Sequence, residues 1–136
     1  MGMPYVVLAA WVIQAAVGVS LVISWWRHGH RGAASVITHA GSLIAGLALW
    51  IAFVVTDALW APWLAFAVMT VGNGFGDVML VQRHRSAAGV SASYGSAIGA
   101  VFSGQMPPRV TFHACFGGVV YFLCLGVCIG ATVAAS

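Results

Sequence analysis

Residues 33–55 read AASVITHAGSLIAGLALWIAFVV, a stretch without Asp, Glu, Lys or Arg. Its length suits a transmembrane helix, which needs about 20 predominantly apolar residues to cross the hydrocarbon core of a bilayer. One titratable side chain, His39, lies inside it. Small residues that permit close contact between helices follow at Gly41, Ala45, Ala48 and Ala52. The stretch therefore predicts a membrane span that carries an imidazole, and such side chains usually have a partner and a task.

The rest of the chain has the composition that this span requires. Of its 136 residues, 62% are hydrophobic and only 5% are charged, which is too little charge to cover a soluble domain. The alternating pattern of a membrane barrel is absent from the sequence. We expect one transmembrane domain with helices over about residues 5–26, 33–55, 63–82 and 108–133. The predicted class is an all-α integral membrane bundle of four helices, arranged up-down-up-down.

The basic residues predict how the bundle is oriented. The formal net charge is +3, and all five cations are arginines next to predicted spans: Arg27, Arg31, Arg83, Arg85 and Arg109. Basic residues in short loops beside membrane spans favour the cytoplasmic side, so their clustering indicates topology rather than nucleic-acid binding. We therefore expect a multi-pass protein of the cell membrane with cytoplasmic arginine-rich loops and both termini outside.

Two features of the predicted loops refine this arrangement. The cytoplasmic loop at residues 83–107 contains Tyr94, Ile98 and Phe102, whose spacing of four favours a short helix at the membrane surface. Each half of the chain also has an apolar run, a basic turn and a span that opens with x-His-Ala. This pattern indicates a 2+2 parallel internal repeat, related by an axis along the membrane normal.

The topology pairs His39 with a second intramembrane histidine, His113. His39 lies eight residues after Arg31, and His113 lies four residues after Arg109. At about 1.5 Å per residue, both imidazoles are expected roughly 6 to 12 Å inside the cytoplasmic boundary. The second and fourth spans run in the same direction and are diagonal neighbours in such a bundle. We therefore expect the two imidazoles to face each other across the core.

Two histidines at one depth favour a bound haem. A b-type haem needs two axial nitrogen ligands, space for its flat ring and cations near its propionates. Gly46 and Gly117, on the same helix faces as the histidines, are expected to give that space, and Arg31 and Arg109 are expected to bind propionates. The leading interpretation is a small cytochrome b that binds haem through His39 and His113. It would transfer electrons with quinone or a larger respiratory complex.

Asp77 leaves a second interpretation open. It lies six residues before Arg83, so it is expected about 9 Å from the cytoplasmic edge, near the histidine layer. It suits three roles: acceptor for an imidazole N–H, proton carrier, or ligand. As a ligand it would join His39 and His113 around a non-haem divalent metal ion, used in metal or proton transport or in metalloenzyme chemistry. An ion pair with Arg83 or Arg27 is the structural alternative.

A third interpretation is an accessory subunit of a membrane complex, in which each histidine only forms a hydrogen bond to a neighbouring helix. The sequence contains no nucleophile triad, phosphate loop or hydride-cofactor motif. We therefore expect a redox protein rather than a stand-alone enzyme. The expected surroundings are the lipid bilayer, and small residues on several helix faces also permit a homodimer.

Overall fold

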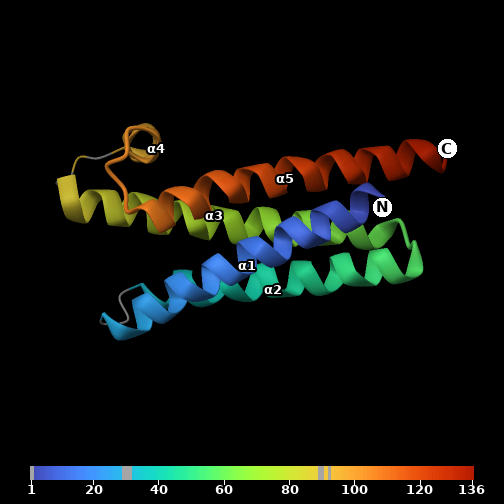
Figure 1. The fold of residues 1–136 in the computed structure, drawn as a ribbon, viewed down its shortest axis with the longest axis horizontal. Helices are drawn as coiled ribbons and strands as arrows, with labels where there is room; N and C mark the ends of the chain where they lie inside the picture. The colour runs from blue at the N-terminus through green and yellow to red at the C-terminus, as the bar shows by residue number, and fades with distance from the viewer. Residues whose placement is uncertain (1, 29–31, 89–90, 92) are drawn as a thin grey trace.

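The fold is that of a computed structural model, described over residues 2–28, 32–88, 91 and 93–136. Four long helices make up the body of the molecule: α1 (Met3–Arg27), α2 (Ala33–Thr56), α3 (Trp60–Ala88) and α5 (Pro108–Ala134). A short helix, α4 (Tyr94–Phe102), lies between the last two along the chain (Figure 1). Within the described residues every regular element is a helix, so the predicted all-α four-helix bundle is confirmed.

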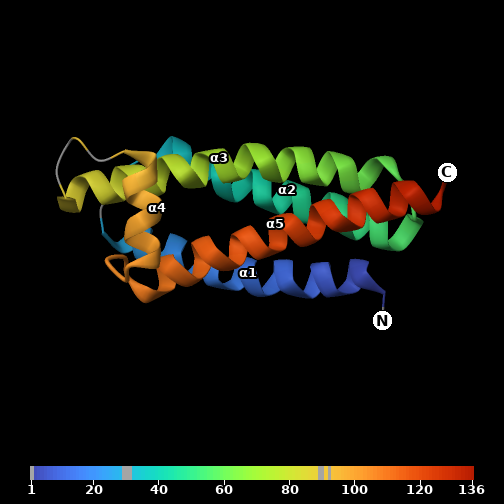
Figure 2. The same ribbon diagram turned by 90° about the horizontal axis from the view of Figure 1, so that it is seen from above.

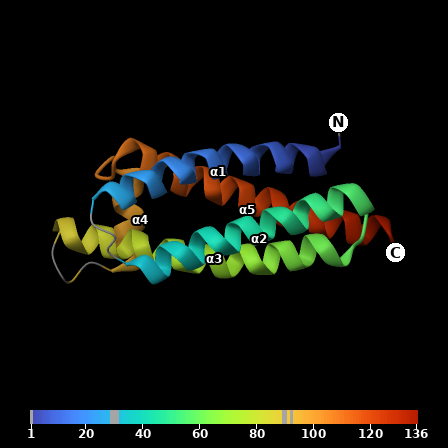
Figure 3. The ribbon, with the colours of Figure 1, turned by 90° about the horizontal axis from the view of Figure 1, so that it is seen from below.

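The long helices alternate in direction along the chain. Both termini lie at one end of the bundle, together with the connection from α2 to α3 (Figure 1). The C-terminal end of α1, the N-terminal end of α2 and helix α4 lie at the other end (Figures 1 and 3). Helix α2 packs most extensively against α3, and α1 packs against α5, whereas α2 and α5 do not adjoin. Helices α2 and α5 are therefore diagonal partners, as expected for an up-down-up-down bundle.

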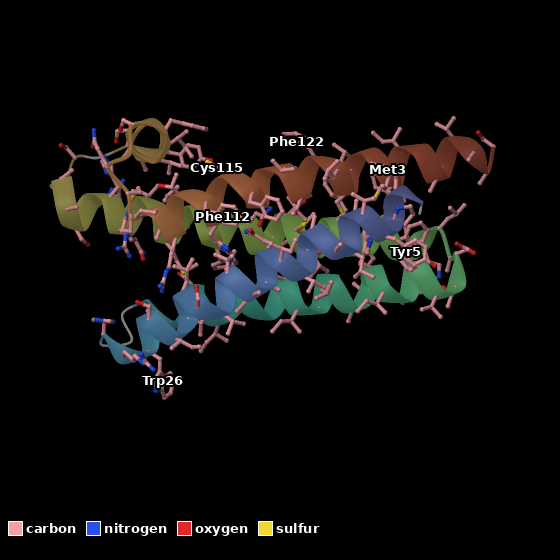
Figure 4. All side chains as sticks on the ribbon, viewed as in Figure 1. Met3, Tyr5, Trp26, Phe112, Cys115 and Phe122 are labelled. Carbon is pink, nitrogen blue, oxygen red and sulfur yellow. The ribbon has the colours of Figure 1, made fainter. Side chains whose placement is uncertain are left out.

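All four long helices are long and apolar enough to cross a membrane. Large apolar side chains also cover the outside of the bundle. Trp26 is 66% exposed and Phe122 is 70% exposed, and both project away from the helices (Figure 4). Since a bilayer solvates such side chains and water does not, the chain is a multi-pass membrane protein.

The helix ends follow local signals in the sequence. Helix α2 ends at Asp57, which adopts a left-handed φ of 55°, and the Asp57 N–H donates to the Phe53 carbonyl at 2.8 Å. Helix α5 begins at Pro108. At the first position of a helix the backbone N–H has no intrahelical acceptor, so the N–H that proline lacks breaks no hydrogen bond. Helix α3 continues to Ala88, six residues beyond the expected end at residue 82. The reason is that no glycine or proline interrupts residues 83–88.

Helix α4 folds back against the arginine-bearing end of the bundle. Its N-terminus is capped by Ser93, whose hydroxyl oxygen accepts from the Ser96 N–H at 3.1 Å. Figure 2 shows α4 running across the space between α3 and α5. Three buried residues of α4, Ala97, Ala100 and Val101, form a small separate core with Leu80 of α3 and with Met106, which follows α4. The short helix expected in this loop therefore exists, and it is attached to the spans by apolar packing.

The main core fills the half of the bundle near the termini. It is built around two tryptophans, Trp11 and Trp50, whose ring centroids lie 6.0 Å apart. The Trp50 indole N–H donates to the Pro4 carbonyl at 3.1 Å, which satisfies the donor inside the core. Buried small residues, among them Ala61 and Ala65 of α3, let the helices approach closely here. The bundle is thus closed by apolar packing at this end.

Candidate functional site

The structure brings the two intramembrane histidines together. His39 projects from α2 and His113 from α5, and their ring centroids lie 6.0 Å apart with ring planes inclined at 74°. His39 is the seventh residue of its helix and His113 the sixth, counted from the same end of the bundle. The two imidazoles therefore bridge the diagonal of the bundle, between helices that do not otherwise adjoin.

The orientation of the His39 ring is determined by a hydrogen bond to α3. Its Nδ1 lies 2.8 Å from the carbonyl oxygen of Gly72. A carbonyl only accepts, so Nδ1 must carry the proton and Nε2 keeps its lone pair. Histidines that bind metals commonly donate their other ring N–H to a backbone carbonyl in this way. The Nε2 of His39 is therefore available as a ligand or a hydrogen-bond acceptor.

The His113 ring faces α1. A β-carbon added at Gly18 would lie 3.2 Å from its Cε1 and 4.0 Å from its Nδ1. That Nδ1 is buried and has no hydrogen-bond partner among the described residues. One turn earlier on α1, the side-chain N–H of Gln14 donates to the His113 carbonyl at 2.8 Å. Gln14 is only 4% exposed, and its Oε1 also lacks a described partner, so this side of His113 is polar but unsatisfied.

Each imidazole also lies close to a glycine of a neighbouring helix. A β-carbon added at Gly76 of α3 would lie 3.0 Å from the His39 Cε1, as one at Gly18 of α1 would crowd His113. Four residues separate Gln14 from Gly18, and four separate Gly72 from Gly76. Each histidine thus contacts a glycine of the other half of the chain.

The glycines expected to leave room for a ring have other neighbours. A β-carbon at Gly46 would lie 3.1 Å from Cζ2 of Trp11, and one at Gly117 would lie 2.8 Å from Nε2 of Gln14. Side chains of α1 therefore fill the space beside both glycines. Arg109 is exposed at the second position of α5, near the end where α4 lies. Arg31 lies outside the described residues.

Asp77 is directed to α4 rather than to the histidines. Its Oδ2 accepts a hydrogen bond from the Tyr94 hydroxyl at 3.2 Å. Across the described part of the chain, no three or more His, Cys, Asp or Glu side chains gather to hold a metal ion. His39, His113 and Asp77 therefore do not form one cluster in this structure, although Asp77 directly follows Gly76, which touches the His39 ring.

Sequence reasoning missed three contacts of this site: Gly18 against His113, Gln14 against the His113 backbone, and Tyr94 against Asp77. A signal for the first two exists, because Gln14 and Gly18 are four residues apart and therefore share one face of an apolar helix. The Tyr94 contact has no such signal. It depends on α4 folding back onto α3, which is a tertiary event.

Comparison of the chain with protein-family models, with curated proteins and with solved structures finds no match. The chemistry of the histidine pair is therefore the main indication of function. That chemistry is an imidazole with a free Nε2, a second imidazole 6.0 Å away, and glycines that admit both rings.

Proposed function

We propose that the chain is a membrane-embedded b-type haem protein in which His39 and His113 are the two axial ligands, and that it transfers electrons. The observation that carries the proposal is the imidazole pair itself. The rings lie 6.0 Å apart on diagonal helices, and the His39 Nδ1 is bound to the Gly72 carbonyl so that Nε2 is left for a metal.

The two imidazoles are near enough to bind one metal ion together. Their ring centroids lie 6.0 Å apart, and metal–nitrogen bonds are about 2 Å long, so both rings would be within reach of one ion held between them.

The number of protein ligands favours haem over an isolated divalent metal ion. A non-haem site generally takes at least three protein ligands, whereas haem iron already holds four nitrogens and needs only two more. Among the described residues, no third His, Cys, Asp or Glu side chain joins the histidine pair. When bound, haem would supply an iron centre that gains and loses single electrons.

Residues of this chain would then hold and orient the ligands. Gly18 and Gly76 admit the two rings, and the Gly72 carbonyl orients His39. The buried Nδ1 of His113 would need an acceptor, and the Oε1 of Gln14, whose side chain already binds the His113 carbonyl, is an unpartnered acceptor on α1. Arg109 remains a candidate partner for a propionate. We leave Gly46 and Gly117 out of the proposed site, because Trp11 and Gln14 lie against them.

The orientation in the membrane completes the proposal. The arginines of the described residues lie at or near helix ends on the side of α4, opposite the termini. By the positive-inside rule that end would be cytoplasmic, with both termini outside. Haem near the cytoplasmic side would exchange electrons with a quinone in the bilayer or with a larger respiratory complex.

The optical spectrum of the purified protein tests the proposal. Protein from haem-replete cells should show a Soret band and the visible bands of low-spin haem. His39→Ala and His113→Ala should each abolish the low-spin spectrum, because each removes one axial ligand. His28→Ala is the matched control, since His28 lies at the exposed end of α1 and should leave the spectrum unchanged.

Absence of a Soret band with both histidines intact would refute the haem proposal. A non-haem metal in stoichiometric amount, lost in His39→Ala, would then favour the divalent-metal interpretation. If His39→Gln and His113→Gln changed neither a bound cofactor nor a bound partner, the accessory-subunit interpretation would replace both.

A further inference from the structure

A separate hollow of about 240 Å³ lies between α3 and α4, on the side of the bundle that holds the arginines. It is open on one side and has both polar and apolar walls. The residues that line it are Asp77, Val78, Val81, Gln82, Arg85 and Tyr94. Five of them come from two turns of α3, and Tyr94 is the first residue of α4. Such a mixture of apolar wall and a few polar groups is typical of sites for small organic ligands.

The polar end of the hollow is a carboxylate and a phenol. The Tyr94 hydroxyl donates to the Asp77 carboxylate at 3.2 Å. Burial, the charge of Asp77 and this hydrogen bond raise the pKa of Tyr94, in that order of importance. The Tyr94 hydroxyl therefore keeps its proton at physiological pH and can donate a hydrogen bond. The Asp77 carboxylate has further lone pairs that can accept one. The pair can thus bind a ligand hydroxyl, which donates to Asp77, and a ligand carbonyl, which accepts from Tyr94.

The apolar part of the hollow lies beside this pair. Val78 follows Asp77 on α3, and Val81 lies one turn further along the helix, followed by Gln82 and, one turn after Val81, Arg85. A flat ring between the valines would reach the carboxylate with one polar group. A second polar group on the opposite side of that ring would point toward the side-chain N–H donors of Gln82 and Arg85.

The hollow also adjoins the histidine pair. Gly76 lies against the His39 ring, since a β-carbon there would be 3.0 Å from its Cε1, and Asp77 is the next residue. Consecutive Cα atoms are about 3.8 Å apart, and each residue turns an α-helix by roughly 100°. Helix α3 therefore presents one residue to the imidazole and the next to the hollow. The hollow and the His39 ring therefore contact consecutive residues of α3.

We propose that this hollow binds the head group of a quinol or quinone. A quinol hydroxyl would donate to the Asp77 carboxylate, the ring would lie against Val78 and Val81, and the Tyr94 hydroxyl could turn to a quinone carbonyl. The volume of about 240 Å³ is below the roughly 300–1,000 Å³ of drug-sized sites, so it suits one ring and leaves an isoprenoid tail in the lipid. The assignment of this partner rests on the proposed electron-transfer function, but the binding site itself does not require haem.

Equilibrium binding of a short-tailed benzoquinone to the full chain in lipid nanodiscs tests the proposal. We expect saturable binding at one site per chain. Asp77→Asn and Tyr94→Phe should each weaken it about tenfold, the loss that corresponds to one hydrogen bond to a charged group. The matched controls are Asp57→Asn and Tyr5→Phe, because Asp57 and Tyr5 lie at the opposite end of the bundle. Neither control should change the affinity.

A second pair of variants tests the site without altering its polar groups. Val78→Trp should fill the hollow and abolish binding, whereas Val71→Trp, two turns earlier on the same helix, should not. Val78 and Val71 are both exposed, so neither substitution burdens the core. This pair keeps the proposal testable even if Asp77→Asn unfolds α4.

The outcomes separate this proposal from the haem proposal. Quinone binding that survives His39→Ala and His113→Ala supports the hollow as an independent site, whatever the spectrum shows. Binding that is equal in Asp77→Asn and Asp57→Asn, or unaffected by Val78→Trp, would overturn it. So would failure of the quinone to bind together with binding of phosphoethanolamine, because a carboxylate and a guanidinium in one groove would then serve a zwitterionic head group.

Discussion

At the scale of single residues, Gly18 and Gly76 decide how closely the helices approach the imidazoles. A β-carbon added at either glycine would meet a histidine ring. A glycine weakens a helix by roughly 1 kcal/mol relative to alanine in water, so its presence against a ring is consistent with a steric requirement. The imidazoles are held by contact with glycine backbone and by the Gly72 carbonyl.

Gly76→Ala is therefore expected to destabilise the protein and to disturb the His39 ring. The added methyl would lie 3.0 Å from Cε1 and 3.1 Å from Nδ1, so the ring must shift by a few tenths of an ångström, and its hydrogen bond to the Gly72 carbonyl opposes that shift. Overpacking of this kind costs about 1–3 kcal/mol. Thermal unfolding in detergent would measure the free-energy change.

Gly74→Ala on the same helix is the matched control. A β-carbon at Gly74 would meet no heavy atom within 4 Å, so this substitution is expected to be neutral or slightly stabilising. If both substitutions changed the stability equally, the effect would belong to the helix in general. The contact between Gly76 and His39 would then have no special importance.

At the scale of elements, the docking of α4 on α3 combines an apolar and a polar contact. Ala97, Ala100 and Val101 bury the apolar face of α4, and the Tyr94 hydroxyl binds Asp77 at its N-terminal end. The hydrogen bond adds a polar contact at the start of α4, and both of its residues line the hollow.

This docking predicts a pH dependence at alkaline pH. The pKa of Tyr94 is raised above its ordinary value of 10.0, chiefly by burial and then by the charge and hydrogen bond of Asp77. A group whose pKa is raised in the folded state contributes stability that is fully present below the unfolded value and is lost as the pH rises through the folded one. The docked state of α4 should therefore persist at pH 10 and weaken above it.

The ultraviolet absorbance of tyrosinate measures this titration, as the difference between the wild type and Tyr94→Phe. In Asp77→Asn the pKa of Tyr94 should fall toward 10.0 without reaching it, because burial remains. A Tyr94 that titrated at or below its ordinary value in the wild type would contradict the hydrogen bond to Asp77.

At the scale of the whole molecule, the two halves of the chain pack against each other through their long helices. The histidine of the first half contacts a glycine of α3, and the histidine of the second half contacts a glycine of α1. The strongest helix pairs, α2 with α3 and α1 with α5, join the two halves of the chain. The halves are thus interleaved, and the proposed site exists only when both are folded together.

The proposed orientation of the bundle predicts which of two introduced cysteines an impermeant reagent labels on intact cells. Asp57→Cys and Ser103→Cys place a thiol at opposite ends of the molecule, at the α2–α3 turn and after α4. In a Cys115→Ala background, an impermeant maleimide added to intact cells should label position 57 but not 103. The remaining thiols, Cys124 and Cys128, are buried and should stay unmodified.

Labelling of position 103 after the cells are opened would provide the matched positive control. Labelling of position 103 but not 57 in intact cells would reverse the proposed orientation. Labelling of both in intact cells would contradict a four-span arrangement, because the two positions are separated by α3, which is apolar enough to cross the bilayer.

The sequence by itself determined the class, the number of spans, their order and the level of the two histidines. These properties follow from the length and hydropathy of each segment and from residue spacing along single helices, which are local quantities. For the same reason it predicted a short helix near Tyr94 and the clustering of arginines at one end. The haem itself stays a proposal.

Only the tertiary structure decided which side chains meet. It placed Trp11 against Gly46, Gln14 against Gly117, Gly18 against His113 and Tyr94 against Asp77. Each of these contacts depends on how a helix is rotated about its own axis and on which neighbour it approaches. Rotation is set by the packing of small residues between segments far apart in the chain, because inside a membrane hydrophobicity favours no one face over another. The tertiary structure also placed the His39 Nδ1 against the Gly72 carbonyl, on which the proposed ligand role of Nε2 depends.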